Sequence, residues 1–402
     1  MKKQIITTLL IILLAVPSFS QKKNENTPSK TTIGYNFTPV VQLKATSVKN
    51  QANTGTCWCF ATTSFIESEL MRMGKGEYDL SEMWIVRYNY IDKLNDNFVQ
   101  QGKGNLGEGS LAHDWMIEFT KHGMVPNEVY TGLNYSMPNH FHGEMNAFLK
   151  AVAKVPVDRK KESDQYTGIV NDILDTYLGK VPETFTYNGV GYTPQSFAKS
   201  LGINPSDYVE ITSFTHFPFY TVGPVPVPDN WRKVEMYNVP LDELIKIMDN
   251  SLNTGYTVDW DGDVSEKGFS HRNGVAIIPE VQRTEAYNAS DKKKYGPMTV
   301  EDRTAEAYRF SQPFPEMNIT QEYRQKGFED ESTTDDHLMH VTGLVKDQNG
   351  TKYYITKNSW GTESNSTGGY LNMSESYVKA KTIFIMVHKD AVPADIRKKL
   401  GF

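Results

Sequence analysis

The sequence predicts an α+β protein whose helices lie mainly in the N-terminal part of the chain and whose antiparallel strands lie mainly in the C-terminal part. Apolar residues recur at helical spacing after Cys57, whereas β-branched and aromatic segments joined by a tight turn follow His337. Hydrophobic residues make up 39% of the chain and aromatic residues 12%, which favours a packed interior over disorder.

Residues 1–20 have the pattern of a secretory signal peptide. Lysines precede an apolar run from Ile5 to Val16, and the small residues Ser18 and Ser20 stand two positions apart, where a signal peptidase would cut. An uncleaved membrane anchor is the alternative. We expect a cleaved, exported chain that is periplasmic or extracellular, with no membrane segment after cleavage.

Length and charge limit the organisation and the partners of the mature chain. Removing residues 1–20 from 402 leaves 382 residues, more than one compact core usually holds. Residues 21–34 are polar and predict a flexible lead-in, and 35–402 would form one domain with an insertion at about 150–255. The net charge of −6, without a basic stripe, argues against nucleic acid as a partner.

Helices are predicted first at Cys57–Met73, where Gly74 and Gly76 supply the end, and then from Ser110 to Lys121, closed by Gly123. The Gly107-Glu-Gly109 segment before the second helix is predicted to be a loop.

The middle of the chain predicts helices at Arg159–Leu178 and Leu241–Leu252. Between them, Pro218, Pro224, Pro226 and Pro228 predict an irregular connection rather than a strand.

Strands are predicted at five places in the rest of the chain: Tyr256–Trp260, Gly274–Ile278, His340–Val345, Lys352–Thr356 and Thr382–Val387. A turn at residues 347–350 joins the third and the fourth. The last residues, Asp390–Phe402, have a helical and basic pattern.

The chain contains two cysteines, Cys57 and Cys59, and their spacing argues against a disulfide between them. Two positions apart on a helix, they point to different faces. A free thiol in an exported chain is typical of a nucleophile, although a buried small apolar residue is the ordinary alternative. Cys57 would open its helix, where the helix N-terminus and a neighbouring imidazolium would both favour the thiolate.

Gln51 stands six residues before Cys57. Its amide NH₂ and the backbone N–H of Cys57 could together hold the oxyanion of a tetrahedral intermediate. Without this spacing, a loop glutamine would be an ordinary solvated residue.

His337 is the expected general base, because imidazole exchanges protons near neutral pH. It precedes a strand whose edge would face the helix of the thiol. His340 is the rival, and a His-x-x-His pair could suggest a metal, but positions three apart on a strand point to opposite faces.

Asn358 would accept a hydrogen bond from His337 and fix its tautomer. Trp360, two residues later, would lie on the same face of a strand and shield that bond from water.

The sequence Asp259-Trp-Asp-Gly-Asp263 is similar to a calcium loop, but its glycine falls at the wrong position and no glutamate closes it. We interpret it as a turn and expect neither a metal nor a cofactor.

Taken together, Gln51, the Cys57-Trp58 pair, His337 and the Asn358-Ser-Trp360-Gly string resemble the papain-like cysteine peptidases. The resemblance implies that the cysteine before tryptophan is the nucleophile, which selects Cys57 and makes Cys59 a core residue. Thr54 stands where many members have a disulfide cysteine. The resemblance also implies a two-subdomain fold, peptide substrates, and a substrate cleft lined by Gly107 and Gly109.

His337 follows Cys57 by 280 residues, about twice the usual spacing in that family. This length resembles the bleomycin hydrolase or aminopeptidase C branch, as do four shorter segments: Leu80–Glu82, Thr215–Tyr220, Val227–Trp231 and Asp263–Phe269.

That branch implies an aminopeptidase that works through an acyl-enzyme thioester, a homohexamer, and a C-terminal arm that blocks endopeptidase action. The export signal and the helical tail depart from it. A papain-like endopeptidase and a catalytically inactive peptide-binding relative are the alternatives.

Overall fold

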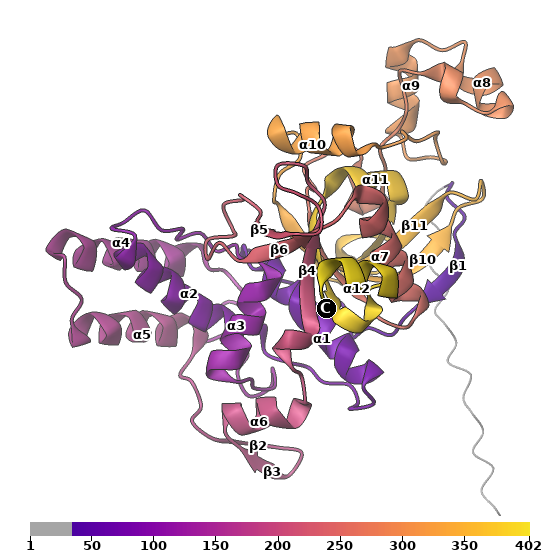
Figure 1. Ribbon diagram of the computed structural model, residues 1–402. Coiled ribbons are helices and arrows are strands. Elements are labelled where there is room, and N and C mark those ends of the chain that lie inside the picture. Colours follow the sequence, from indigo (N-terminus) through magenta and orange to yellow (C-terminus); the bar gives the residue numbers. More distant parts are fainter. Residues whose placement is uncertain (1–33) are drawn as a thin grey trace, which may run out of the picture.

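The computed structural model describes residues 34–402 (Figure 1). The predicted signal peptide, residues 1–20, and all of the predicted lead-in except Gly34 lie outside the described residues.

The core of the fold is an 11-stranded sheet in the order β5-β6-β4-β13-β7-β10-β11-β12-β9-β8, with β1 paired to β10. Most neighbours are antiparallel, whereas β4 with β6 and β9 with β12 are parallel. A separate hairpin is formed by β2 and β3. The strands are β1 (Thr38–Gln42), β2 (Phe185–Tyr187), β3 (Val190–Tyr192), β4 (Tyr208–Thr212), β5 (Val222–Pro224), β6 (Glu235–Asn238), β7 (Val258–Gly262), β8 (Phe269–Ser270), β9 (Val275–Ala276), β10 (His337–Lys346), β11 (Lys352–Lys357), β12 (Tyr370–Ser374) and β13 (Thr382–His388).

Helices surround this sheet, and Figure 1 shows α2 to α5 extending to one side of it. The helices are α1 (Cys57–Arg72), α2 (Glu82–Val99), α3 (Ala112–His122), α4 (Gly143–Arg159), α5 (Asp164–Leu178), α6 (Pro194–Leu201), α7 (Leu241–Asn253), α8 (Ala289–Tyr295), α9 (Val300–Ala307), α10 (Gln321–Glu329), α11 (Glu375–Lys381) and α12 (Ala394–Leu400). The predicted α+β class is confirmed.

The strand β10 lies between β7 and β11 and separates two hydrophobic cores. Successive side chains of a strand point to opposite faces. Leu338 of β10 therefore packs into the core of α1, whereas Met339 and Val341 pack into the core of α7 and α11. This places the start of β10 beside α1.

The helix α1 is buried on all sides, because every residue from Trp58 to Leu70 is buried. The continuous burial fixes the position of its first residue, Cys57, against the sheet. The predicted helix at Cys57–Met73 is confirmed, as is the one at Leu241–Leu252.

Three local predictions are wrong. The predicted turn at Asp259–Asp263 is mostly the strand β7, because Asp259 lies on the α1 face, where Thr62 donates a 2.6 Å hydrogen bond to it. Pro224 ends the short edge strand β5, where a missing N–H is tolerated. The predicted helix Arg159–Leu178 begins only at Asp164, after Ser163 caps it.

The segment predicted as an insertion, about 150–255, contributes β4, β5 and β6 to the main sheet as well as the helices α5, α6 and α7. Its boundaries stay a prediction.

A peripheral unit with α8 and α9 stands out beyond α10 in Figure 1. Its two ends meet at the antiparallel bridge between Pro279 and Glu316, and it has a small core of its own. That core consists of Tyr287, Tyr295, Ala307 and Phe314.

The predicted helical tail is confirmed as α12. Its Ile396 and Leu400 pack into the core of α7, and the Phe402 ring lies 5.0 Å from the Tyr237 ring. Within residues 34–402, no helix is both long and apolar enough to span a membrane.

Candidate active site

Cys57 is the first residue of α1 and is half-buried. Its thiol lies at the backbone N–H of Leu338, the second residue of β10. The first N–H groups of a helix have no partner within the helix, so the Cys57 N–H is available to a ligand. Cys59 instead lies in the core, where its thiol donates to the Glu82 carbonyl over 3.2 Å.

His337 precedes Leu338, so its backbone lies close to the Cys57 thiol. Its Nε2 donates to Asn358 Oδ1 over 2.8 Å. Asn358 Oδ1 also accepts the backbone N–H of Ser359 over 2.7 Å, and the Asn358 amide donates to His271 Nδ1 over 3.4 Å. With Nε2 carrying the proton, the Nδ1 edge of His337 is the basic one.

Trp360 packs on this pair, with its ring 4.9 Å from that of His337 and 4.8 Å from that of His271. The prediction that Trp360 continues a strand is wrong, because β11 ends at Lys357 and Trp360 forms an isolated bridge with Asn50. The loop nevertheless brings the indole to the side of the imidazole.

Gln51 is 6% exposed and is held from both ends of its amide. Its Oε1 accepts the Ser359 hydroxyl over 2.6 Å, and its Nε2 donates to the Thr54 carbonyl over 2.8 Å. An amide nitrogen has two N–H donors, so one remains for a ligand. The next residue, Ala52, has φ 51°, a left-handed conformation that costs about 1–3 kcal/mol and is typical of functional loops.

The electrostatics of the resting site favour a neutral thiol and a neutral imidazole. Burial and nearby carboxylates raise the pKa of Cys57 to about 12. Burial lowers the pKa of His337 to about 4, against the opposing effect of the Asn358 hydrogen bond. Both shifts act against a thiolate–imidazolium pair, which stays a prediction from the sequence.

The comparisons with known proteins agree with this geometry. Residues 39–172 match the model of the family "Papain family cysteine protease", and residues 288–401 match that of the "Peptidase C1-like family". The chain resembles the crystal structure of PepW from Lactobacillus rhamnosis with a TM-score of 0.66 at 18% identity, over 90% of this chain and 84% of the other. The chain is a papain-like cysteine peptidase.

Two curated relatives of the peptidase come from Lactobacillus delbrueckii subsp. lactis. Aminopeptidase C is 22% identical over 94% of this chain and 86% of its own length. Aminopeptidase W is 20% identical over 90% of this chain and 85% of its own length. The similarity thus spans both the helical part and the sheet of the peptidase.

Gly107 and Gly109 lie beside the start of α1 in the peptidase. The Trp58 indole donates to the Glu108 carbonyl over 3.1 Å, and the Glu108 carboxylate accepts the Gly55 N–H over 2.6 Å. Lys93 donates to the carbonyls of Gly107 and Gly109 and so fixes the segment from behind.

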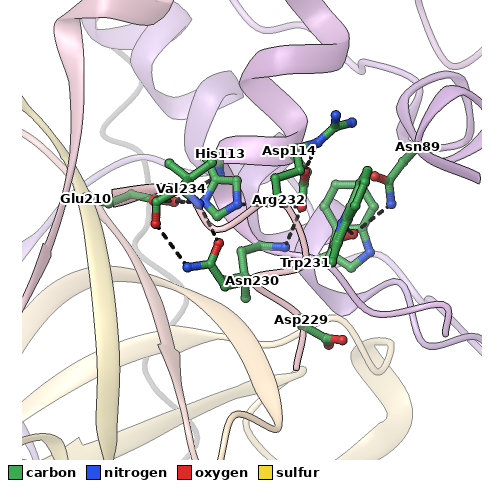
Figure 2. A network of polar contacts seen from close by, with 12 residues as sticks. Asn89, His113, Asp114, Glu210, Asp229, Asn230, Trp231, Arg232 and Val234 are labelled. Atoms are coloured by element: carbon green, nitrogen blue, oxygen red, sulfur yellow. Dashed lines mark hydrogen bonds and ion pairs between the residues drawn. The ribbon is translucent and has the colours of Figure 1, made fainter. Parts of the chain in front are cut away.

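A network of polar contacts anchors the loop between β5 and β6 to α2 and α3 (Figure 2). The Arg232 guanidinium contacts the carboxylates of Asp92, Asp114 and Glu118, at 2.8 Å for Asp92 and 2.6 Å for Asp114. Arg232 also stacks on the Trp231 ring at 4.1 Å. The network fixes the position of this loop in the peptidase.

Sequence reasoning missed three acidic residues of this region, Asp229, Asp261 and Asp335. Their charges all act to raise the pKa of Cys57. For Asp261 the sequence offered a signal. Asp259 and Asp261 alternate with Trp260, and on a strand this places both carboxylates on the face opposite the tryptophan.

Proposed function

We propose that this chain is an exported aminopeptidase that hydrolyses peptides through a thioester on Cys57. His337 acts as general base and acid, Asn358 orients its ring, and Gln51 with the Cys57 N–H stabilises the oxyanion. Trp58 and Trp360 support these groups, and Gly107 and Gly109 lie along the bound peptide.

The observation that supports this proposal best is the 2.8 Å hydrogen bond from His337 to Asn358, because His337 directly precedes Leu338, whose N–H lies at the Cys57 thiol. It gives the imidazole one protonated and one basic edge, which is the state that a general base requires. Relatives named aminopeptidase C and aminopeptidase W, which align with most of the chain, support the substrate class.

The reaction follows from these positions. The Cys57 thiol gives its proton to His337 Nδ1 while sulfur attacks the peptide carbonyl carbon, and the oxygen takes up negative charge at the donors of Gln51 and Cys57. The C–N bond then breaks, and the departing amine takes the proton from the imidazolium. Water, deprotonated by His337, hydrolyses the thioester and restores the thiol.

The test is hydrolysis of peptides with a free N-terminus and of the same peptides N-acetylated, by the purified chain and by Cys57→Ala. We expect turnover of the free peptides alone, and none with the alanine variant. Cys59→Ser is the matched control, since Cys59 lies in the core and should leave turnover in place. Thiol-dependent hydrolysis by Cys57→Ala would refute the proposal.

A papain-like endopeptidase is the second candidate, favoured by the position of the C-terminal residues. Helix α12 and Phe402 pack on the α7 side of the molecule, away from α1. Internal cleavage of the N-acetylated peptides would select this candidate. An inactive peptide-binding relative would give no turnover and no reaction of Cys57 with a peptide electrophile at neutral pH.

Export and assembly are part of the proposal. Expression of the full chain with fractionation should place a product shortened by residues 1–20 outside the cytoplasm. A full-length product in the cytoplasm would refute export. Size measurement of that product in the assay buffer tests the homohexamer.

A further inference from the structure

This inference rests on the proposed function and concerns what recognises the substrate's N-terminus. In an aminoacyl group, the nitrogen is separated from the carbonyl carbon only by Cα, which places the two atoms about 2.5 Å apart by standard bond lengths and angles. A group that binds the α-ammonium must therefore lie next to the nucleophilic sulfur.

Asp229 lies close enough to that sulfur for its charge to raise the pKa of Cys57. An added Cβ at Gly109 would meet Asp229 Oδ2 at 1.9 Å, so this carboxylate lies against the bare backbone of the segment that contacts Trp58. Figure 2 shows Asp229 separate from the polar network formed by its neighbours in the loop.

The two oxygens of Asp229 differ in their partners. Oδ1 accepts the Asn105 amide over 3.1 Å, and Asn105 also accepts the Gly107 N–H over 2.7 Å. Oδ2 accepts no hydrogen bond from the residues the structure describes. The carboxylate is thus oriented by one oxygen and open at the other.

A second, fully buried carboxylate lies behind it. Asp261 is 0% exposed, and its side chain is hydrogen-bonded to that of Asp335; burial and the Asp335 carboxylate raise the pKa of Asp261 well above its usual range. It pairs in register with Leu338, whose N–H meets the Cys57 thiol. Asp335 is the hydrogen-bond partner of Asp261, and its carboxylate also lies at the Asp229 backbone N–H.

A carboxyl pair that shares one proton still carries one negative charge, and a buried negative charge without a cationic partner is costly. No lysine or arginine among the described residues forms an ion pair with Asp229, Asp261 or Asp335. We propose that Asp229, backed by the Asp261–Asp335 pair, binds the α-ammonium group of the peptide substrate.

This placement also links recognition to reactivity. In the free protein the three acidic residues disfavour the thiolate of Cys57. A bound ammonium compensates their negative charge and favours the thiolate, whereas an acetylated N-terminus brings no positive charge. A substrate with a free N-terminus therefore helps to activate the nucleophile that attacks it.

The test compares an aminoacyl anilide with the matched acyl anilide in which hydrogen replaces the amino group. The measured quantity is the ratio of the two kcat/KM values. If turnover of the acyl anilide is too slow to measure, the ratio is taken instead from the second-order rate constants with which the corresponding aminoacyl and acyl electrophiles modify Cys57. Asp229→Asn should lower the ratio about 10- to 10²-fold, the range for a hydrogen bond to a charged group.

Asp172→Asn is the matched control, because Asp172 is exposed on α5 and its substitution removes the same charge. Asp172→Asn should leave the ratio of the two kcat/KM values unchanged. Asp229→Glu should give a ratio between those of Asp229→Asn and the wild type. In the wild type the ratio should also fall as the amine deprotonates near pH 8, and this fall should disappear in Asp229→Asn. Thermal melting of each variant verifies its folding.

A folded Asp229→Asn protein with the wild-type ratio would overturn the inference, as would an equal loss on both substrates. A wild-type ratio near one would instead contradict the aminopeptidase proposal itself, so the two failures can be told apart.

Discussion

His337 Nε2 and Asn358 Oδ1 are 2.8 Å apart, and the same oxygen accepts the Ser359 N–H over 2.7 Å. The second hydrogen bond holds the asparagine amide in one orientation, so that its oxygen rather than its nitrogen faces the imidazole. The tautomer of His337 is therefore set by the backbone of the loop after β11.

Replacing Asn358 with alanine should lower kcat roughly tenfold with little change in KM, because one hydrogen bond contributes about 0.5–1.5 kcal/mol. Asn358→Asp keeps the acceptor and adds a negative charge, so it should retain more activity and raise the pKa of His337. Steady-state kinetics over a pH series measures both effects. Equal losses in the two variants would argue against an orienting role.

Gln51→Ala should lower kcat about 10²-fold, the usual effect of removing one oxyanion donor. Gln51→Glu should cost as much, since it keeps the size of the side chain but lacks the N–H. Ser359→Ala removes the hydroxyl that holds Gln51 Oε1 and leaves both N–H donors, so a smaller loss is expected. If Ser359→Ala were as slow as Gln51→Ala, the glutamine would be structural.

The reaction of Cys57 with a small neutral alkylating agent should accelerate with pH. Burial and the nearby carboxylates raise the pKa of its thiol to about 12, so the thiolate fraction grows tenfold per pH unit throughout the neutral range. Mass spectrometry of the labelled chain gives the rate, with Cys57→Ala as the blank. A rate that is constant from pH 5 to 8 would show a preformed thiolate instead.

Arg232→Ala should reduce the free energy of unfolding by about 3–5 kcal/mol, because it leaves buried carboxylates without their partner. Two of these, Asp114 and Glu118, are 0% exposed. Lys121→Ala is the matched control: its ion pair with Asp92 is at the surface and is worth about 0–1 kcal/mol. Urea unfolding measures both, and similar losses would contradict the network's role.

The sequence indicates the candidate site through short local spacings. Gln51 and Cys57 belong to one loop and helix start, and Asn358 and Trp360 belong to one loop, so short-range patterns were enough to single them out. Helix α1 was predictable for the same reason, because its apolar residues recur at helical spacing.

The features that the sequence did not predict depend on tertiary packing. Helix α2 contains Glu82, Arg87 and Lys93 at buried positions, so its polar pattern hides its burial. The acidic residues Asp229, Asp261 and Asp335 come from three distant segments, and only the pairing of β7 with β10 brings two of them together. The raised pKa of Cys57 depends on that assembly and has no local signal.

The bridge between Pro279 and Glu316 makes the α8–α9 unit a detachable module, since its two ends already touch. Its small core of Tyr287, Tyr295, Ala307 and Phe314 is separate from the cores around β10. A short turn in place of residues 281–314 would give a trimmed scaffold, which loses the packing of Phe310 on Val345 and Tyr353 of the sheet. The same position would accept a foreign domain, so the fold offers an insertion point remote in sequence from each residue of the proposed chemistry.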